Sequence, residues 1–289
     1  MKRILIVILL VVLAGVAGVV VRSSSSDSGT IAELRELTSH RAQAATTDVI
    51  RQTYPLSPGA RVEVAGINGR VTIETSPDTK MADLEIERTA SSQEALERRK
   101  IKIESDGNSL RIHGETVEHN LVAKLFGSKA SEKVTLKLPA QVALFVKGVN
   151  GPLVVGAIDG AIEVEGVNGK VHVANAAGSA SFKGINGHVV AGLKSIEQGG
   201  VTLKGINGSI ELQLPANLNA DFEATGMNGR VISDIPNVVV DKHKRGNYWA
   251  RIGSGGKGIS AKGINGNIRL TFATATATAT IPAADSTRK

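Results

Sequence analysis

The chain has 289 residues, a formal charge of +7 and no cysteine, which excludes disulfides and thiolate metal sites. It contains 32 glycines while only 3% of its residues are aromatic, so its core must be built from Val, Ile, Leu and Ala. The positive charge favours weak association with anionic partners and says nothing about the fold.

Residues 1–22 have the pattern of a membrane anchor or a signal peptide. Lys2 and Arg3 precede an uninterrupted apolar run, residues 4–21, which Arg22 ends. At about 1.5 Å per residue the run spans roughly 27 Å, close to the thickness of a bilayer core. It is longer than the apolar part of a secretory signal, which is roughly 7–15 residues. We therefore expect an uncleaved transmembrane helix in the membrane, with a cleaved signal peptide as the alternative.

Positive charge before an apolar run keeps the N-terminus in the cytoplasm. The remainder of the chain is then expected in the bacterial cell envelope, on the periplasmic or extracellular side. Residues 23–52 predict a Ser-rich spacer and an amphipathic helix, because apolar residues recur at helical spacing over Thr30–Thr53.

Residues 53–272 predict one all-β domain, since apolar and polar residues alternate from Arg61 to Phe272. Two segments interrupt the alternation. Ser91–Arg99 predicts a short helix with a serine cap, and Asp106–Asn108 predicts a tight turn. Residues 273–289 are a low-complexity Thr/Ala segment, which we expect to be a disordered tail.

One tetrapeptide, Gly-aliphatic-Asn-Gly, is repeated through the domain. Its seven copies begin at Gly66, Gly148, Gly166, Gly184, Gly205, Gly226 and Gly263. On both sides of each copy the apolar residues keep one fixed register relative to the tetrapeptide. The repeat therefore predicts a structural corner that is used many times.

Two architectures fit this repeat. In an antiparallel hairpin meander, each Asn-Gly would form a type I′ turn and Leu203 would pair with Leu212. In a β-solenoid, which resembles a parallel β-helix, each coil has two short strands and two corners, and equivalent asparagines hydrogen-bond in a ladder. The near-constant period and identical corners favour the solenoid, with the meander as the alternative.

Five stretches of the domain together resemble a known family: YPLSPGARVEVAGINGRVTIE, MADLEIERTASSQEALERRKIKIESDGNSLRIHG, EKVTLKLPA, VNGPLVVGAIDGAIEVEGVNGKV and IGSGGKGISAKGINGNIRL. The family is the bacterial putative-adhesin family of unknown function, related to the head GIN-domain proteins, and the resemblance covers about residues 53–271. It implies an exported β-helix-like domain and no established chemistry. The helix expected before residue 53 and the Thr/Ala tail are departures from it.

The residues that could carry chemistry do not form a recognisable site. Gly253–Gly258 satisfies G-x-G-x-x-G, but a dinucleotide site needs a helix after the loop, and an alternating strand follows instead. The six histidines form no helical metal-binding pair. We expect no cofactor, no metal and no catalytic residue. The domain's acidic residues are scattered: Asp159, Glu163, Glu165, Glu211, Asp221 and Glu223.

The best candidate for binding is a basic stripe beside the corners. In each copy the residue just before the first glycine, or just after Asn-Gly, points outward by the alternation. The basic residues at these positions are Arg70, Lys147, Lys170, Lys183, Lys204, Arg230 and Lys262. In chain order Glu165 and Thr225 interrupt the column. A solvated surface is the simpler interpretation, and a weak, salt-sensitive anion site is the functional one.

These observations favour a non-enzymatic, membrane-anchored envelope protein that acts as an adhesin or interaction module. The partners that fit the stripe are an anionic glycan, a lipid headgroup or an envelope protein. Specific nucleic-acid binding is not expected, because stacking aromatics are scarce. The alternatives are a polysaccharide-active β-helix enzyme, for which no acid pair stands out, and an envelope-stress regulator or scaffold.

Overall fold

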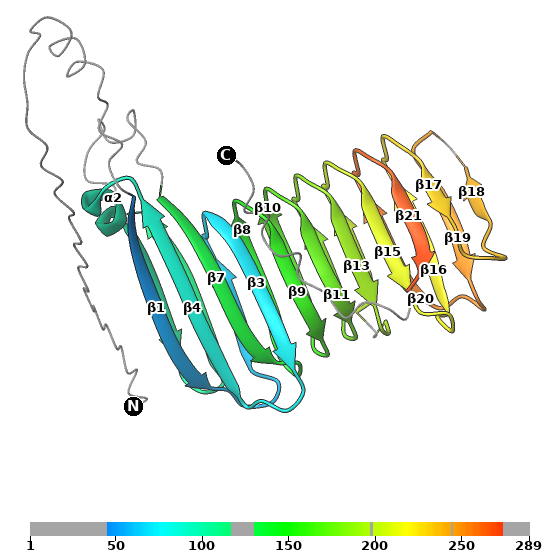
Figure 1. Ribbon diagram of the computed structural model, residues 1–289. Helices are drawn as coiled ribbons and strands as arrows, with labels where there is room; N and C mark the ends of the chain where they lie inside the picture. Colours follow the sequence, from blue (N-terminus) through cyan, green and yellow to red (C-terminus); the bar gives the residue numbers. More distant parts are fainter. Residues whose placement is uncertain (1–44, 117–129, 197–198, 244, 274–289) are drawn as a thin grey trace, which may run out of the picture.

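The computed structural model describes residues 45–116, 130–196, 199–243 and 245–273. Within these residues the chain forms two large β-sheets that pack face to face (Figure 1). The one helix among them is α2 (Gln93–Arg98). The all-β prediction is confirmed.

Each sheet is one continuous series of hydrogen-bonded strands. Sheet A has the order β1 (Thr46–Pro55), β4 (Met81–Ala90), β7 (Ala130–Pro139), β3 (Gly69–Ser76), β9 (Leu153–Ile158), β11 (Val171–Ala176), β13 (Val189–Leu193), β15 (Ile210–Leu214), β21 (Ile268–Phe272) and β17 (Val231–Ser233). Sheet B has the order β18 (Val240–Lys242), β19 (Tyr248–Ile252), β16 (Ala220–Thr225), β20 (Lys257–Lys262), β14 (Val201–Lys204), β12 (Ala180–Lys183), β10 (Ile162–Val167), β8 (Ala143–Val149), β2 (Arg61–Ala65), β6 (Ser109–Thr116) and β5 (Arg99–Ser105).

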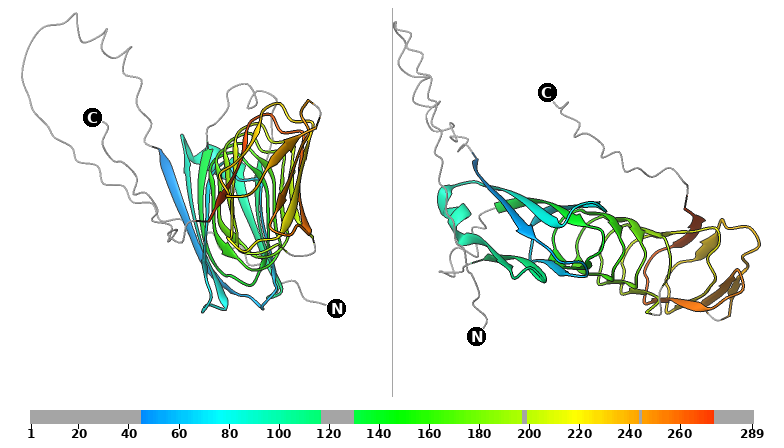
Figure 2. Two further views of the ribbon diagram at one scale, coloured as in Figure 1. Left: turned by 90° about the vertical axis from the view of Figure 1, so that its right-hand side faces the viewer. Right: turned by 90° about the horizontal axis from the view of Figure 1, so that it is seen from below.

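Each tetrapeptide joins a strand of sheet B to a strand of sheet A, and we call such a strand pair a coil. Strands of neighbouring coils run parallel, as β10 does with β8 and β12. Leu203 accordingly pairs with Phe182 and Ala261, not with Leu212, so the hairpin pairing does not form. Figure 2 shows successive coils following one another along the molecule.

The core lies between the two sheets and is almost entirely aliphatic. Inward positions that flank the corners, such as Val164, Leu203 and Leu212, are fully buried. The alternation in the sequence therefore identified the inward face correctly. Each such side chain contributes about 1.5–3 kcal/mol on burial, which makes the repeated Val, Ile and Leu the main stabilising term.

The order of coils in the stack differs from their order in the chain. At one end, β20 and β21 lie between the coil β14–β15 and the coil β16–β17, although they follow both in sequence. At the other end, β2 and β3 lie between β6–β7 and β8–β9. Antiparallel strands then cover most of the stack ends: β4, β1 and β5 at one, and β19 and β18 at the other. Open parallel edges, which invite aggregation, are thereby shortened.

The predicted asparagine ladder is confirmed. In each step the side-chain amide of one asparagine donates to the side-chain oxygen of the previous coil's asparagine, over 2.9–3.2 Å. The order along the stack is Asn68, Asn150, Asn168, Asn186, Asn207, Asn265 and Asn228. The ladder therefore has the order of the stack and not the order of the chain.

Both glycines of the corner are required by the backbone. Gly184, which opens one copy, has φ of +59°, a left-handed conformation that favours glycine. Gly187, which closes it, has φ of +158°, and a Cβ there would lie 2.1 Å from the carbonyl oxygen of Gly169 in the preceding coil. Close stacking of the coils therefore excludes any side chain at this position.

Two of the smaller predictions are confirmed and one is wrong. The helix α2 begins after Ser92, whose side chain accepts a hydrogen bond from the amide of Ala95. Asp106 closes the predicted turn, accepting from the amide of Asn108 at 3.0 Å. The helix expected over Thr30–Thr53 is contradicted over residues 46–53, which belong to strand β1.

Strand β1 forms because its alternate residues find a core. Ile50 and Tyr54 point inward and pack against the main cluster, while β1 pairs with β4 along its whole length. This tertiary pairing outweighs the helical spacing of the apolar residues. The rest of that predicted helix, the anchor at residues 4–21 and residues 274–289 lie outside the described part. Among the described residues, no helix is long and apolar enough to cross a membrane.

Candidate functional site

Three lysines of the predicted stripe lie side by side on sheet B. Lys183 pairs with Lys204, and Lys204 pairs with Lys262, in adjacent parallel strands. Adjacent strands lie about 4.8 Å apart, so the three side chains start from one straight line. We call this set the lysine row: Lys183, Lys204 and Lys262. The sequence placed Thr225 between Lys204 and Lys262, and this is wrong because β20 inserts between β14 and β16.

The lysine row differs along its length in how its charge is balanced. Lys183 Nζ lies 2.8 Å from Glu163 Oε1, and this hydrogen bond raises the pKa of Lys183 above its ordinary value. Lys204 and Lys262 are exposed, and within the described residues neither has an acidic partner. Two such charges repel by only about 1 kcal/mol in water. The uncompensated charge of the row is therefore concentrated on Lys204 and Lys262.

Lys147 continues the lysine row on the other side of Glu165. Glu165 lies in register between Lys147 and Lys183, as the sequence predicted. The Lys147 ammonium lies 3.4 Å from the Glu165 carboxylate, so this part of the stripe is an alternating ion-paired strip. Lys147 is therefore less available than Lys204 to an anionic partner.

The remaining three basic residues lie on the sheet A side of the corner. Arg70 is the second residue of β3, and Lys170 and Arg230 directly precede β11 and β17. The coil carrying Pro152 separates Arg70 from Lys170, and β13, β15 and β21 separate Lys170 from Arg230. The structure thus leaves these three apart, so the expected single column does not form and only its sheet B residues lie in a row.

A row of hydroxyls runs beside the lysine row, and the sequence reasoning missed it. Ser181, Thr202 and Ser260 pair with one another in the same three strands, two residues before each lysine. Two residues is one period of a strand, so these residues lie on the same face as the lysines. Thr202 is half-buried and Ser260 exposed, whereas the Ser181 hydroxyl oxygen is buried and has no hydrogen-bond partner among the described residues. The signal was present in the sequence as a Ser or Thr three residues before each of these motif glycines.

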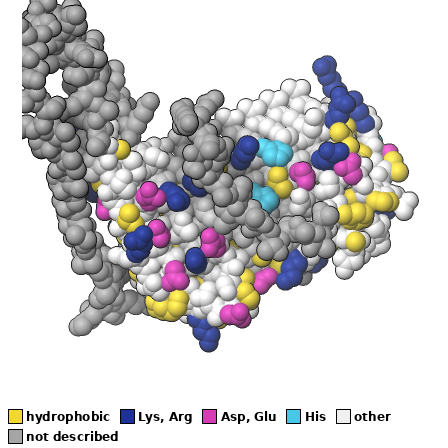
Figure 3. Space-filling model, viewed as in Figure 1, with side chains coloured by type: hydrophobic (Ala, Val, Ile, Leu, Met, Phe, Trp, Pro, Cys, Tyr) yellow, Lys and Arg dark blue, Asp and Glu magenta, His cyan; other side chains and the backbone are white. Residues whose placement is uncertain are grey.

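The outer face of sheet A has a different charge arrangement. Figure 3 shows acidic and basic side chains mixed over its N-terminal strands. They pair across strands, for example Arg51 with Glu85 at 3.1 Å and Lys133 with Glu87 at 3.6 Å. Cross-strand pairs of opposite charge contribute to sheet stability. On these N-terminal strands, within the described residues, positive charges are therefore balanced by acidic neighbours.

The glycine-rich stretch Gly253–Gly258 forms the connection between β19 and β20 with its first four residues, and its last two begin β20. The side chain of Asn219 accepts from the amide of Ser254 at 2.9 Å, and that of Asp221 accepts from Gly256 at 3.1 Å. The Gly256 amide, together with Arg251, lowers the pKa of Asp221. These amides are already occupied by the protein's own side chains, as expected for a corner and not for a nucleotide loop.

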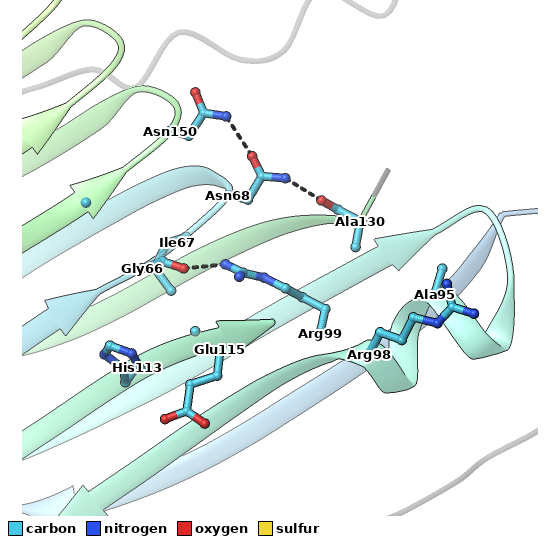
Figure 4. Close-up of a pocket in the computed structure, with 12 residues that line it drawn as sticks. Gly66, Ile67, Asn68, Ala95, Arg98, Arg99, His113, Glu115, Ala130 and Asn150 are labelled. Atoms are coloured by element: carbon cyan, nitrogen blue, oxygen red, sulfur yellow. Dashed lines mark hydrogen bonds between the residues drawn. The ribbon is translucent and has the colours of Figure 1, made fainter. Parts of the chain in front are cut away.

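A cavity of about 810 Å³ opens near the first corner, at the N-terminal end of the stack (Figure 4). Its lining includes Arg99, Asn68 and His113, and Figure 4 shows Arg99 reaching the carbonyl of Gly66. Arg99 also binds Glu132, a fully buried carboxylate. Arg99 is thus held by structural contacts on the side of the cavity that adjoins the ladder.

Glu132 has a structural role that sequence reasoning did not foresee. It lies on strand β7, which no tetrapeptide precedes, and it pairs with Gly69. Glu132 Oε2 accepts a hydrogen bond from the backbone N–H of Asn68 at 2.7 Å, while the Asn68 side-chain amide donates to the carbonyl of Ala130 at 2.6 Å. Where no previous asparagine exists, the Ala130 carbonyl therefore accepts the first ladder bond, and the buried Glu132 carboxylate accepts the backbone N–H of Asn68.

The scattered acids are mostly engaged with neighbours. Asp159 pairs with Lys194 at 3.4 Å, Asp221 pairs with Arg251 at 3.2 Å, and Glu211 accepts from a glutamine. In the part of the chain that the structure describes, no group of three or more His, Asp or Glu could hold a metal ion. The geometry of these residues therefore favours surface ion pairing over acid–base chemistry.

No family model matches the chain, and no curated protein matches it. Among solved structures, it is similar to a putative cell adhesion protein from Clostridium sporogenes ATCC 15579, with 13% identity, a TM-score of 0.39, and coverage of 78% of this chain and 99% of that chain. A putative adhesin from Bacteroides fragilis NCTC 9343 has 12% identity, a TM-score of 0.26, and coverage of 77% and 97%.

A putative adhesin from Parabacteroides merdae ATCC 43184 has 10% identity, a TM-score of 0.22, and coverage of 78% and 96%. With TM-scores of 0.39 and below, these structures carry no argument about how this chain acts. Solved structures similar to this chain are thus adhesins or cell adhesion proteins of Bacteroides, Parabacteroides and Clostridium by name, the class of protein that its sequence resembles.

Proposed function

We propose that this chain is an exported, non-enzymatic adhesin or interaction module of the bacterial envelope, built as a β-solenoid. The lysine row, together with Thr202 and Ser260, forms its binding face, and the ligand is an anionic glycan. The apolar run at residues 4–21 holds the domain at the membrane, with the domain on the periplasmic or extracellular side.

The observation that carries this proposal is the adjacency of Lys204 and Lys262. Two uncompensated ammonium groups lie on neighbouring strands, and Thr202 and Ser260 lie beside them on the same flat face. A glycan that bears carboxylate or sulfate groups along an extended chain offers charge to the lysines and hydroxyls to the hydroxyl row. A lipid headgroup or an envelope protein would share only the charge.

The test measures binding of the exported domain to polygalacturonate, a linear polyanionic glycan, at increasing salt. We expect binding that weakens as salt rises, because exposed charges are screened. The double variant Lys204→Glu/Lys262→Glu should lose at least about tenfold in affinity, since a lysine near a polyanionic surface contributes about 1 kcal/mol.

A matched control separates this face from net charge. Lys80 and Lys100 are exposed lysines far from the lysine row, and within the described residues neither forms an ion pair. Lys80→Glu/Lys100→Glu makes the same change in charge and should bind like the wild type. Equal loss in both double variants, or no loss in the first, would overturn the proposed face. The same binding assay is run with neutral dextran and with anionic vesicles. Weaker binding to both than to polygalacturonate identifies an anionic glycan as the preferred partner.

A further inference from the structure

All seven corners contain Asn-Gly, the dipeptide in which asparagine most readily loses its side-chain amide. The backbone nitrogen of the glycine attacks the side-chain carbonyl carbon of the asparagine, and ammonia leaves as a succinimide ring closes. Water then opens the ring to aspartate or isoaspartate. Glycine permits this reaction because it has no side chain to obstruct the approach.

Inside the stack the corner restrains both reacting groups. Asn207 donates to Asn186 and accepts from Asn265, so its side-chain amide is held from both sides. The nucleophile is occupied too, because Gly208 donates its N–H to the carbonyl of Asn265 at 3.0 Å. Six of the seven asparagines accept a ladder bond from the next coil in this way.

The last corner of the stack lacks these restraints. No coil follows β16–β17, so within the described residues the side-chain oxygen of Asn228 has no donor and the Gly229 amide has no acceptor. Gly229 is also exposed, while the closing glycines of the other six corners are half-buried. Water therefore has access to this peptide group.

We propose that Asn228–Gly229 is a site of spontaneous deamidation, while the stacked corners are protected by the ladder. The Gly229 nitrogen loses its proton to solvent and bonds to the Asn228 side-chain carbon, and the C–N bond to ammonia breaks. Water adds to either carbonyl of the ring. The overall change replaces the amide by a carboxylate and releases one ammonia, with water as the only co-reactant.

This modification changes the end of the ladder. The Asn228 amide is the donor to Asn265 at 2.9 Å, and a carboxylate cannot donate. Two oxygens then face each other, and isoaspartate also lengthens the backbone within the corner. The coil β16–β17 loses its ladder bond to the rest of the stack and gains one negative charge beside Arg230.

The experiment follows the folded protein at mildly alkaline pH and 37 °C by tryptic digestion and tandem mass spectrometry. Asn207 and Asn228 fall in one tryptic peptide, Gly205–Arg230, so the protected site serves as an internal reference. We expect Asn228 to deamidate at least about tenfold faster than Asn207, because two hydrogen bonds restrain Asn207 and its glycine.

The same time course in concentrated urea is the control. Unfolding removes the stack, and the two sites should then react within a fewfold of each other, since both are followed by glycine. A folded-state rate at Asn228 no higher than that at Asn207 would overturn the proposal. So would a difference between the two sites that persists unchanged in urea.

Discussion

Replacing Asn186 by alanine removes one rung from the middle of the asparagine ladder. The Asn186 side chain donates to Asn168 at 3.2 Å and accepts from Asn207 at 3.1 Å, so two hydrogen bonds are lost. Its own backbone amide bond to Val167 at 2.8 Å remains. The residue is not among those with positive φ, and alanine therefore fits the backbone without strain.

The expected cost is about 2 kcal/mol, since each hydrogen bond contributes about 1 kcal/mol net. For a domain of this size that lowers Tm by roughly 4–8 °C. Asn228→Ala removes only one ladder bond and should cost about half as much. Thermal unfolding followed by circular dichroism measures both. An Asn186→Ala variant with the Tm of the wild type, or an equal shift in both variants, would refute the ladder as a stabilising element.

Two further predictions concern the charged groups that the fold places at its corners. Glu132→Gln removes the buried carboxylate that pairs with the partly buried Arg99 and should destabilise the domain by about 3 kcal/mol, measured by urea unfolding. The pKa of Asp221 lies below its ordinary value because the carboxylate accepts from the Gly256 amide and pairs with Arg251. Its contribution to stability is therefore present above that value and is lost as the pH falls through the lowered pKa. Arg251→Ala should raise the Asp221 pKa measured by carboxyl NMR, and no change would contradict the pairing.

The features that repeat in the sequence are the ones that could be predicted from it. An inward residue such as Leu203 and a corner asparagine such as Asn186 recur in one register, so each copy supports the interpretation of the others. The ladder follows from that register, because equivalent corners must stack if equivalent strands pair. Local chemistry likewise identified the cap at Ser92 and the turn at Asp106.

The features that the sequence did not reveal depend on which strands, distant in the sequence, become neighbours in a sheet. The position of β20 beside β14 is not encoded in any local pattern, and it alone brings Lys204 next to Lys262. The buried pair of Arg99 and Glu132 joins residues from distant strands, each of which looks like an ordinary surface charge. Strand β1 formed for a similar reason, because the edge of β4 was available to it.

The order of the coils is tested most directly by engineered cysteines, which are clean probes because the chain has none. Lys204→Cys/Lys262→Cys places two thiols on neighbouring strands about 4.8 Å apart, within the range that a disulfide spans. Lys204→Cys/Thr225→Cys places them two strands apart, at roughly twice that distance. Mild oxidation followed by non-reducing electrophoresis and peptide mapping should cross-link the first pair and not the second. Cross-linking of the second pair alone would show that the coils stack in chain order, and the lysine row would not exist.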